Sequence, residues 1–128
     1  MDREQLTKYI EETYSTSAEY VFEGDDKTAV FRHQNNRKWF AIIMEIPRSR
    51  LGLSGDETIA VVNTKCDYIL ISSHLRDPGH FPAYHMNKSH WITSALDGTV
   101  PKERLCSLID ISNELTRQKR KKRNEKRK

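Results

Sequence analysis

Several features that mark large classes of protein are missing from this sequence. No run of apolar residues approaches the roughly 18 that a transmembrane helix needs. Residues 1–5 (MDREQ) are charged where a secretory signal needs an apolar core. We therefore expect a cytoplasmic protein with no membrane span. Cysteine is scarce: Cys66 and Cys106 form no C-x-x-C pair, which favours reduced thiols over a disulfide.

Motifs for catalysis and for cofactor binding are also missing. The chain lacks G-x-S-x-G, H-E-x-x-H, G-x-x-x-x-G-K-[ST] and G-x-G-x-x-G, and its five glycines leave little material for a phosphate-binding loop. We expect no enzyme, no catalytic residues and no cofactor. His80, His85 and His90 recur every five residues, a spacing that suits neither one helix face nor one strand face. We therefore expect no metal site and interpret His90 as a hydrogen-bonded structural residue, with a zinc site as the less favoured alternative.

Charge is present in abundance but is unevenly distributed. The net charge of the chain is +4. Residues 117–128 (RQKRKKRNEKRK) hold nine Lys or Arg and one Glu, whereas residues 1–116 hold 13 basic and 17 acidic side chains. We expect 117–128 to be a disordered basic tail, able to bind DNA, RNA or an anionic membrane surface by releasing counterions. A tail that only improves solubility is the alternative.

Hydrophobic periodicity divides residues 1–116 into helices and strands of a single domain. The period of 3.6 predicts helices over 2–14, 67–75 and 102–116. The period of two predicts strands over 19–23, 28–33, 38–46, 58–64 and 90–96, with residues 80–89 irregular. This order, α-β-β-β-β-α-β-α, indicates an α+β fold in which helices pack on one face of an antiparallel sheet.

The short connections place the basic hairpin tips at different ends of the sheet. The turn at Arg37 and Lys38 lies at one end, while the loop 48–57, which contains Arg48 and Arg50, lies at the other end with the acidic turn at 25–26.

The stretch from Tyr84 to Trp91 contains an unusual number of ring-bearing and polar side chains. Lysine next to an aromatic residue suits an anionic or nucleotide ligand, although we favour a core position for Trp91. The candidates for a ligand or partner groove are Tyr84, His85, Asn87, His90 and Trp91.

Five stretches resemble the MmcQ/YjbR family of small bacterial proteins. They are 38–42 (KWFAI), 63–67 (NTKCD), 82–92 (PAYHMNKSHWI), 96–101 (LDGTVP) and 108–112 (LIDIS). The resemblance covers residues 1–116 and implies a two-layer sandwich with an antiparallel five-stranded sheet, similar to secretion chaperones and frataxin-like proteins. It also implies DNA binding through a "double wing" of hairpins and transfers no catalytic residue. The tail lies outside the shared pattern.

These observations predict a non-enzymatic DNA-binding protein that contacts phosphates through its hairpin loops and its tail. The alternative is a chaperone-like adaptor that binds a protein partner through the sheet face or the segment 84–91. The candidate phosphate contacts are Arg37, Lys38, Arg48, Arg50, Lys88, Arg117, Lys119, Arg120, Lys121, Lys122 and Arg123.

Overall fold

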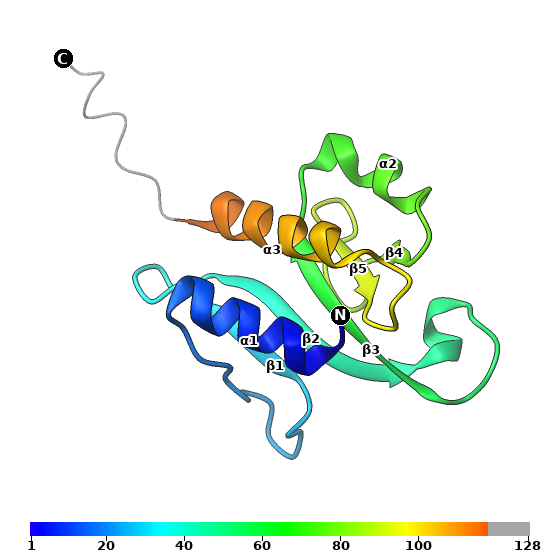
Figure 1. Cartoon of the computed structure of the whole chain (residues 1–128), viewed down its shortest axis with the longest axis horizontal. Coiled ribbons are helices and arrows are strands. Elements are labelled where there is room, and N and C mark those ends of the chain that lie inside the picture. Colours follow the sequence, from blue (N-terminus) through cyan, green and yellow to red (C-terminus); the bar gives the residue numbers. More distant parts are fainter. Residues whose placement is uncertain (118–128) are drawn as a thin grey trace.

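The computed structural model describes residues 1–117, so the predictions for Lys119, Arg120, Lys121, Lys122 and Arg123 lie outside the described residues. Within 1–117, no helix is long and apolar enough to cross a membrane. The elements follow one another along the chain in Figure 1. They are α1 (Arg3–Tyr14), β1 (Ala29–Arg32), β2 (Trp39–Pro47), η1 (Arg48–Leu51), β3 (Thr58–Lys65), η2 (Tyr68–Leu70), α2 (Ile71–Leu75), β4 (His80–Pro82), β5 (Trp91–Ala95) and α3 (Lys102–Thr116).

The five strands form one antiparallel sheet in the order β1-β2-β3-β5-β4. Helices α1 and α3 lie side by side over one face of this sheet (Figure 1). The predicted α+β fold with two layers is therefore confirmed. The other face of the sheet carries no long helix within residues 1–117 and is covered in part by loops.

The core lies between the two long helices and the sheet. Leu6 and Ile10 of α1 and Ile109 of α3 are fully buried against Phe31 of β1 and Ile43 of β2. Burial of each such side chain contributes about 1.5–3 kcal/mol to folding. A capping box is present at the start of α1, because the side chains of residues 2 and 5 each accept the other's backbone N–H.

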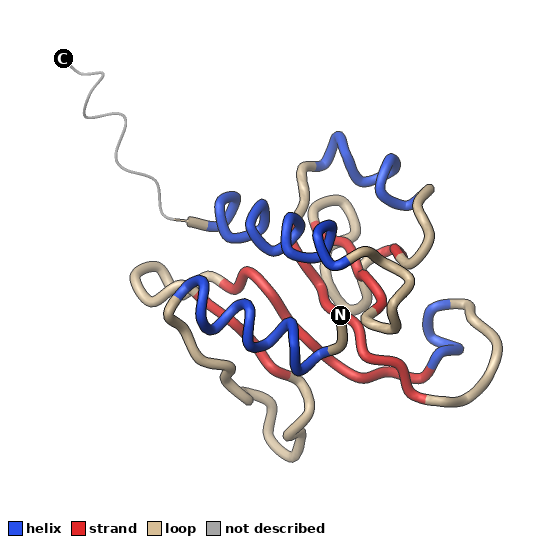
Figure 2. Tube along the Cα trace, viewed as in Figure 1, coloured by secondary structure: helices blue, strands red, loops and turns tan. Residues whose placement is uncertain are grey.

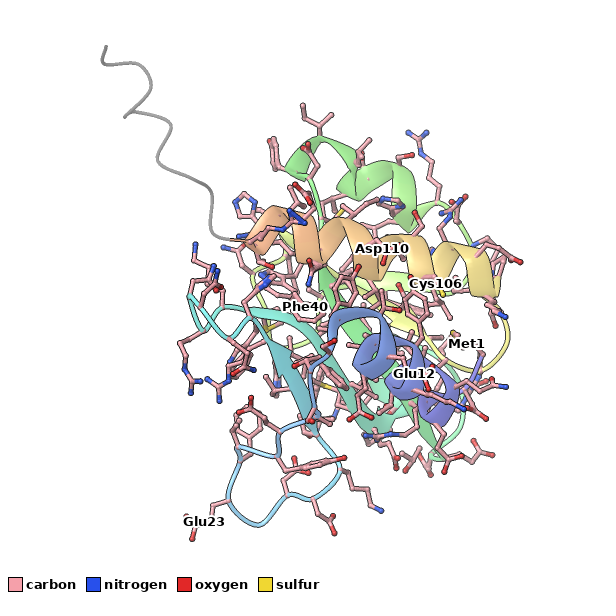
Figure 3. The ribbon with its side chains drawn as sticks, turned by 60° about the vertical axis from the view of Figure 1, so that its left-hand side comes forward. Met1, Glu12, Glu23, Phe40, Cys106 and Asp110 are labelled. Carbon is pink, nitrogen blue, oxygen red and sulfur yellow. The ribbon has the colours of Figure 1, made fainter. Side chains whose placement is uncertain are left out.

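Polar contacts also join α3 to the rest of the domain. Asp110 of α3 accepts hydrogen bonds from the hydroxyls of Tyr9 and Tyr14 on α1, and Figure 3 shows its position on α3. Burial and this carboxylate raise the pKa of Tyr9 to about 12. Buried Ser112 donates to the carbonyl of Phe40 at 2.6 Å and accepts the backbone N–H of Lys65 at 2.8 Å. One hydroxyl therefore joins α3 to both β2 and β3.

The strand predicted over 19–23 is wrong. Figure 2 shows residues 15–28 as a loop, whose β-bridge to the sheet joins Glu19 to Val30. The Asp25 side chain accepts the backbone N–H groups of Lys27 and Thr28, which turns the chain away from the edge of β1. The side chains of Tyr20, Val21 and Phe22 are exposed as a result.

The fifth strand is β4, in the part of the chain predicted to be irregular. It has three residues, His80, Phe81 and Pro82, and it pairs with β5 at the edge of the sheet. A proline is tolerated on an edge strand because its missing N–H can face away from the ladder. A strand this short, ending in proline, shows no period of two that a sequence pattern could reveal.

Candidate functional site

The turn between β1 and β2 is fixed to the C-terminal end of α3. The ring Nε2 of His33 lies 2.8 Å from Oγ1 of Thr116, and Nδ2 of Asn36 donates to the Thr116 carbonyl at 2.9 Å. Arg37 has a positive φ of 63°, and its N–H donates to the carbonyl of His33. The backbone N–H of Lys38 donates to Asn36 Oδ1. Both basic side chains of the turn remain exposed.

This attachment brings together cations that are 80 residues apart in the sequence. The turn between β1 and β2, which carries Arg37 and Lys38, lies beside the C-terminal end of α3 (Figure 1). Arg117 directly follows α3. Burial lowers the pKa of the His33 ring, and the charges of Arg117 and Lys38 lower it further, because both are close to it. We call Arg37, Lys38 and Arg117 the basic end.

The other hairpin tip carries no excess of positive charge. The loop 48–57 (RSRLGLSGDE) contains two basic and two acidic side chains. Arg48 is used within the loop, since its Nε donates to the carbonyl of Ser54 at 2.8 Å and lies 4.0 Å from Oε1 of Glu57. Arg50 is exposed. As predicted from connectivity, this loop lies at the opposite end of the sheet from Arg37.

Lys88 also serves a structural purpose. Its Nζ donates to the carbonyl of Ala83 at 2.8 Å and so closes the loop between β4 and β5. A phosphate contact by Lys88 would cost this hydrogen bond.

A second candidate site is a cleft of about 430 Å³ on the sheet face opposite the long helices. Its floor is formed by the alternating residues Ile42, Met44 and Ile46 of β2. We call it the open-face cleft. It is lined by Phe22, Asp25, Thr28, Trp39, Ile42, Met44, Glu45, Ile46, Tyr84, His85 and Met86.

An irregularity in the β1–β2 pairing directs Trp39 to the open-face cleft. Phe31 pairs with Ala41, but Arg32 pairs with Trp39, so β2 has one additional residue there. This β-bulge changes the phase of the side chains. Phe40 therefore packs under the helices, while Trp39 lines the opposite face.

A buried polar network fixes the segment 84–91 to the sheet. Asn63 of β3 donates to the carbonyl of Tyr84 at 3.0 Å and accepts the hydroxyl of Thr93 on β5. The same hydroxyl accepts the N–H of Tyr84 at 2.8 Å. Asn63 and Thr93 are fully buried, so the hydrogen bond between their side chains is protected from water. The network determines where Tyr84 and His85 lie.

Two of the five predicted groove residues line the open-face cleft, namely Tyr84 and His85. Asn87 instead shapes a turn, because its side chain accepts the N–H of Ser89 and its carbonyl accepts those of the residues at 90 and 91. His90 is exposed and Trp91 pairs in the sheet with Lys65.

Sequence reasoning missed several residues of the cleft. Phe22, Trp39, Met44 and Met86 were not predicted to lie there. The position of Met44 could have been predicted, because it alternates with Ile42 and Ile46 along β2. The position of Phe22 depends on the path of the 15–28 loop and that of Trp39 on the β-bulge, and neither can be read from the sequence pattern.

The histidines make separate contacts. His80 is buried, with Nδ1 2.8 Å from Oγ of Ser94, and its ring centroid lies 6.0 Å from that of His74. His85 stacks on Tyr84 instead. In the described chain, no group of three or more His, Cys, Asp or Glu side chains is placed to hold a metal ion. The buried histidine with a side-chain hydrogen bond is therefore His80, whereas the His90 side chain is exposed.

Both cysteines are free thiols. Burial raises the pKa of Cys66 and of Cys106, and the neighbouring carboxylates of Asp67 and Asp110 raise it further. Because the thiolate is the nucleophilic form, both are poor nucleophiles near neutral pH.

Acidification is expected to destabilise the domain. Burial lowers the pKa of His80, His74 and His33 below the ordinary value of 6.5. Below pH 6.5 the unfolded chain therefore takes up protons that the folded chain does not, and stability falls as the pH falls. We expect Tm to decrease between about pH 7.5 and about pH 5.5. His80→Asn should make this decrease of Tm with pH shallower, whereas His90→Asn, the control at an exposed position, should not. Equal slopes of Tm against pH in the two variants would contradict a contribution of buried His80 to the acid sensitivity.

Comparison with known proteins identifies relatives of the whole domain. The YjbR family profile matches residues 11–115. The chain is 38% identical over 118 residues to the uncharacterized protein YyaQ of Bacillus subtilis, covering 91% of this chain and 99% of that protein. A crystal structure of a Pseudomonas syringae protein is similar with a TM-score of 0.90 and 41% identity, covering 91% of this chain and all of the other. A Deinococcus radiodurans protein is similar with a TM-score of 0.66 and 26% identity, over 97% of this chain and 86% of the other. The chain belongs to the YjbR family.

Proposed function

We propose that this YjbR-family chain is a non-enzymatic DNA-binding protein that contacts phosphates through its basic end and the basic segment that follows it. The attachment of the β1–β2 turn to Thr116 carries the proposal, because it places Arg37 and Lys38 next to the start of residues 117–128. Cations that share one surface neutralise successive phosphates and release their counterions together.

The charge of the rest of the domain surface restricts the expected phosphate contacts to the basic end. Residues 1–116 hold four more acidic than basic side chains, so the rest of the domain repels a phosphate backbone. Residues 117–128 contain no aromatic side chain that could stack on bases. Phosphate contacts carry no sequence information, and we therefore expect binding without sequence preference.

The test is the double variant Arg37→Asn and Lys38→Ser in the full chain. Asparagine tolerates the positive φ at position 37, so the turn keeps its shape while both charges are removed. If both side chains contact phosphates, the slope of log K against log salt for duplex DNA should fall by about 1.8. Fluorescence anisotropy of a labelled duplex over a salt series measures this slope.

The matched control removes two exposed charges from the other end of the sheet, through Lys27→Ser and Arg50→Ser. It lowers the net charge equally, so an effect of total charge alone would change both variants alike. The proposal requires a clearly larger change in slope for the variant of the turn. Equal changes would place the domain's phosphate contacts elsewhere.

The alternative function, binding of a protein partner on the sheet face, stays a prediction. It is supported by the exposed side chains of Tyr20, Val21 and Phe22 next to the open-face cleft. Partner binding there would depend weakly on salt and would be unaffected by changes at Arg37 and Lys38.

A further inference from the structure

We propose that the open-face cleft binds a small organic cation whose charge is carried by a quaternary ammonium group. This inference goes beyond the proposed DNA binding, since no residue of the basic end lines the cleft. It depends on three properties of the lining residues: the aromatic rings, the sign of the charge, and the hydrogen bonds that the carboxylates already make.

Aromatic rings from three separate segments meet at the cleft. Phe22 of the 15–28 loop and Trp39 of β2 pack edge to face, with ring centroids 6.0 Å apart and planes at 87°. Tyr84 and His85 of the β4–β5 loop stack at 4.0 Å with nearly parallel planes. The faces of such rings carry negative partial charge and attract cations, and perpendicular rings provide walls in two directions.

The charged residues of the cleft have one sign. Asp25 and Glu45 are among its lining residues, and no Lys or Arg from residues 1–117 lines it. Arg3 neutralises Glu45 at 2.9 Å, whereas Asp25 makes no ion pair within the described chain. The cleft therefore repels anions such as phosphates and favours a positive charge.

The carboxylates already accept hydrogen bonds from this chain. Oδ1 of Asp25 accepts the backbone N–H groups of Lys27 and Thr28, and Oδ2 accepts the Thr28 hydroxyl. Oε2 of Glu45 accepts from Arg3. A primary ammonium or a guanidinium would lose its hydrogen bonds to water and regain few in the cleft. A quaternary ammonium has no N–H group to satisfy and retains both the attraction to the rings and that to the charge.

The size of the cleft favours a small molecule as the source of this cation. Its volume of about 430 Å³ lies within the roughly 300–1,000 Å³ of ordinary small-molecule sites. The apolar floor of Ile42, Met44 and Ile46 provides a surface for methyl groups and for a short carbon chain.

The experiment compares choline with its neutral carbon isostere, 3,3-dimethylbutan-1-ol, as probes of the full chain by NMR. Choline is expected to shift the Trp39 indole signal and the methyl signals of Met44 and Met86 saturably, with a higher affinity than the isostere. Trp39→Leu keeps an apolar wall but removes the ring, and should weaken choline binding roughly three- to thirtyfold. Trp39→Phe should retain part of the affinity. Tyr68→Leu, at an exposed tyrosine outside the cleft, should leave it unchanged.

Three outcomes would overturn the proposal: equal affinity for choline and the isostere, no saturable shift with choline, and choline binding that is unchanged in a folded Trp39→Leu protein. Where choline gives no saturable shift, binding of a trimethyllysine peptide would identify a modified protein side chain as the source of the cation. The dispersion of the amide spectrum verifies that each variant is folded.

Discussion

Removal of residues 118–128 is expected to lower the affinity of the chain for duplex DNA roughly four thousandfold near 0.1 M salt, with about four of the removed cations in contact with phosphates. The removed segment holds eight Lys or Arg and one Glu, which is the densest positive charge in the sequence. Each phosphate contact contributes about 0.9 to the slope of log K against log salt, so the slope should fall by about 3.6. A salt series measured by anisotropy gives both values.

The matched control keeps the length of the chain and replaces the eight basic residues of 118–128 by glutamine. It should bind DNA as weakly as the truncated chain, because charge and not chain length produces the affinity. The remaining affinity of the 1–117 chain should then decrease further with Arg37→Asn and Lys38→Ser. A truncated chain that binds DNA with the slope of the full chain would refute a role for this segment.

The fold could be predicted from the sequence where hydrophobic periodicity and packing require the same structure. Leu6 and Ile10 recur at helical spacing, and both are fully buried in α1. Strand β2 is apolar on both sides: α1 and α3 cover one side, and loops cover the other in part, leaving the floor of the open-face cleft. For residues 19–23 the prediction was wrong, because the three consecutive apolar residues Tyr20, Val21 and Phe22 have strand-like composition but lie exposed in a loop.

The candidate sites were less predictable because long-range contacts assemble them. The basic residues of the β1–β2 turn were identified from the sequence, but no pattern indicates that Asn36 bonds to Thr116, 80 residues later. The cleft depends on the bulge that directs Trp39 away from the helices, and a bulge leaves no period in the sequence. Tyr84 and His85 were found because their residue types are chemically conspicuous.

Substitution of Asn63 by leucine is expected to destabilise the domain by about 2–5 kcal/mol, because it removes the acceptor of the buried Thr93 O–H and the donor to the Tyr84 carbonyl. The side chains are similar in volume, so little of this cost arises from packing. The Tyr84 carbonyl loses the hydrogen bond from Asn63 Nδ2, and the Thr93 hydroxyl loses its acceptor, Asn63 Oδ1, while it still accepts the N–H of Tyr84. Urea unfolding of wild type and variant, monitored by circular dichroism, measures the difference.

The threonine of the same network supplies the control. Thr93→Ser keeps the hydroxyl that bonds both Asn63 and the N–H of Tyr84, and it should cost less than Thr93→Val, which removes the hydroxyl and keeps the shape. A valine variant as stable as the serine variant would show that packing, not hydrogen bonding, holds Tyr84 in place. Because this network positions Tyr84 and His85, Asn63→Leu should also broaden their NMR signals and weaken choline binding in the cleft. The side-chain amide of Asn63, which is remote in sequence from the aromatic residues, thus links the stability of β3 and β5 to the shape of the open-face cleft.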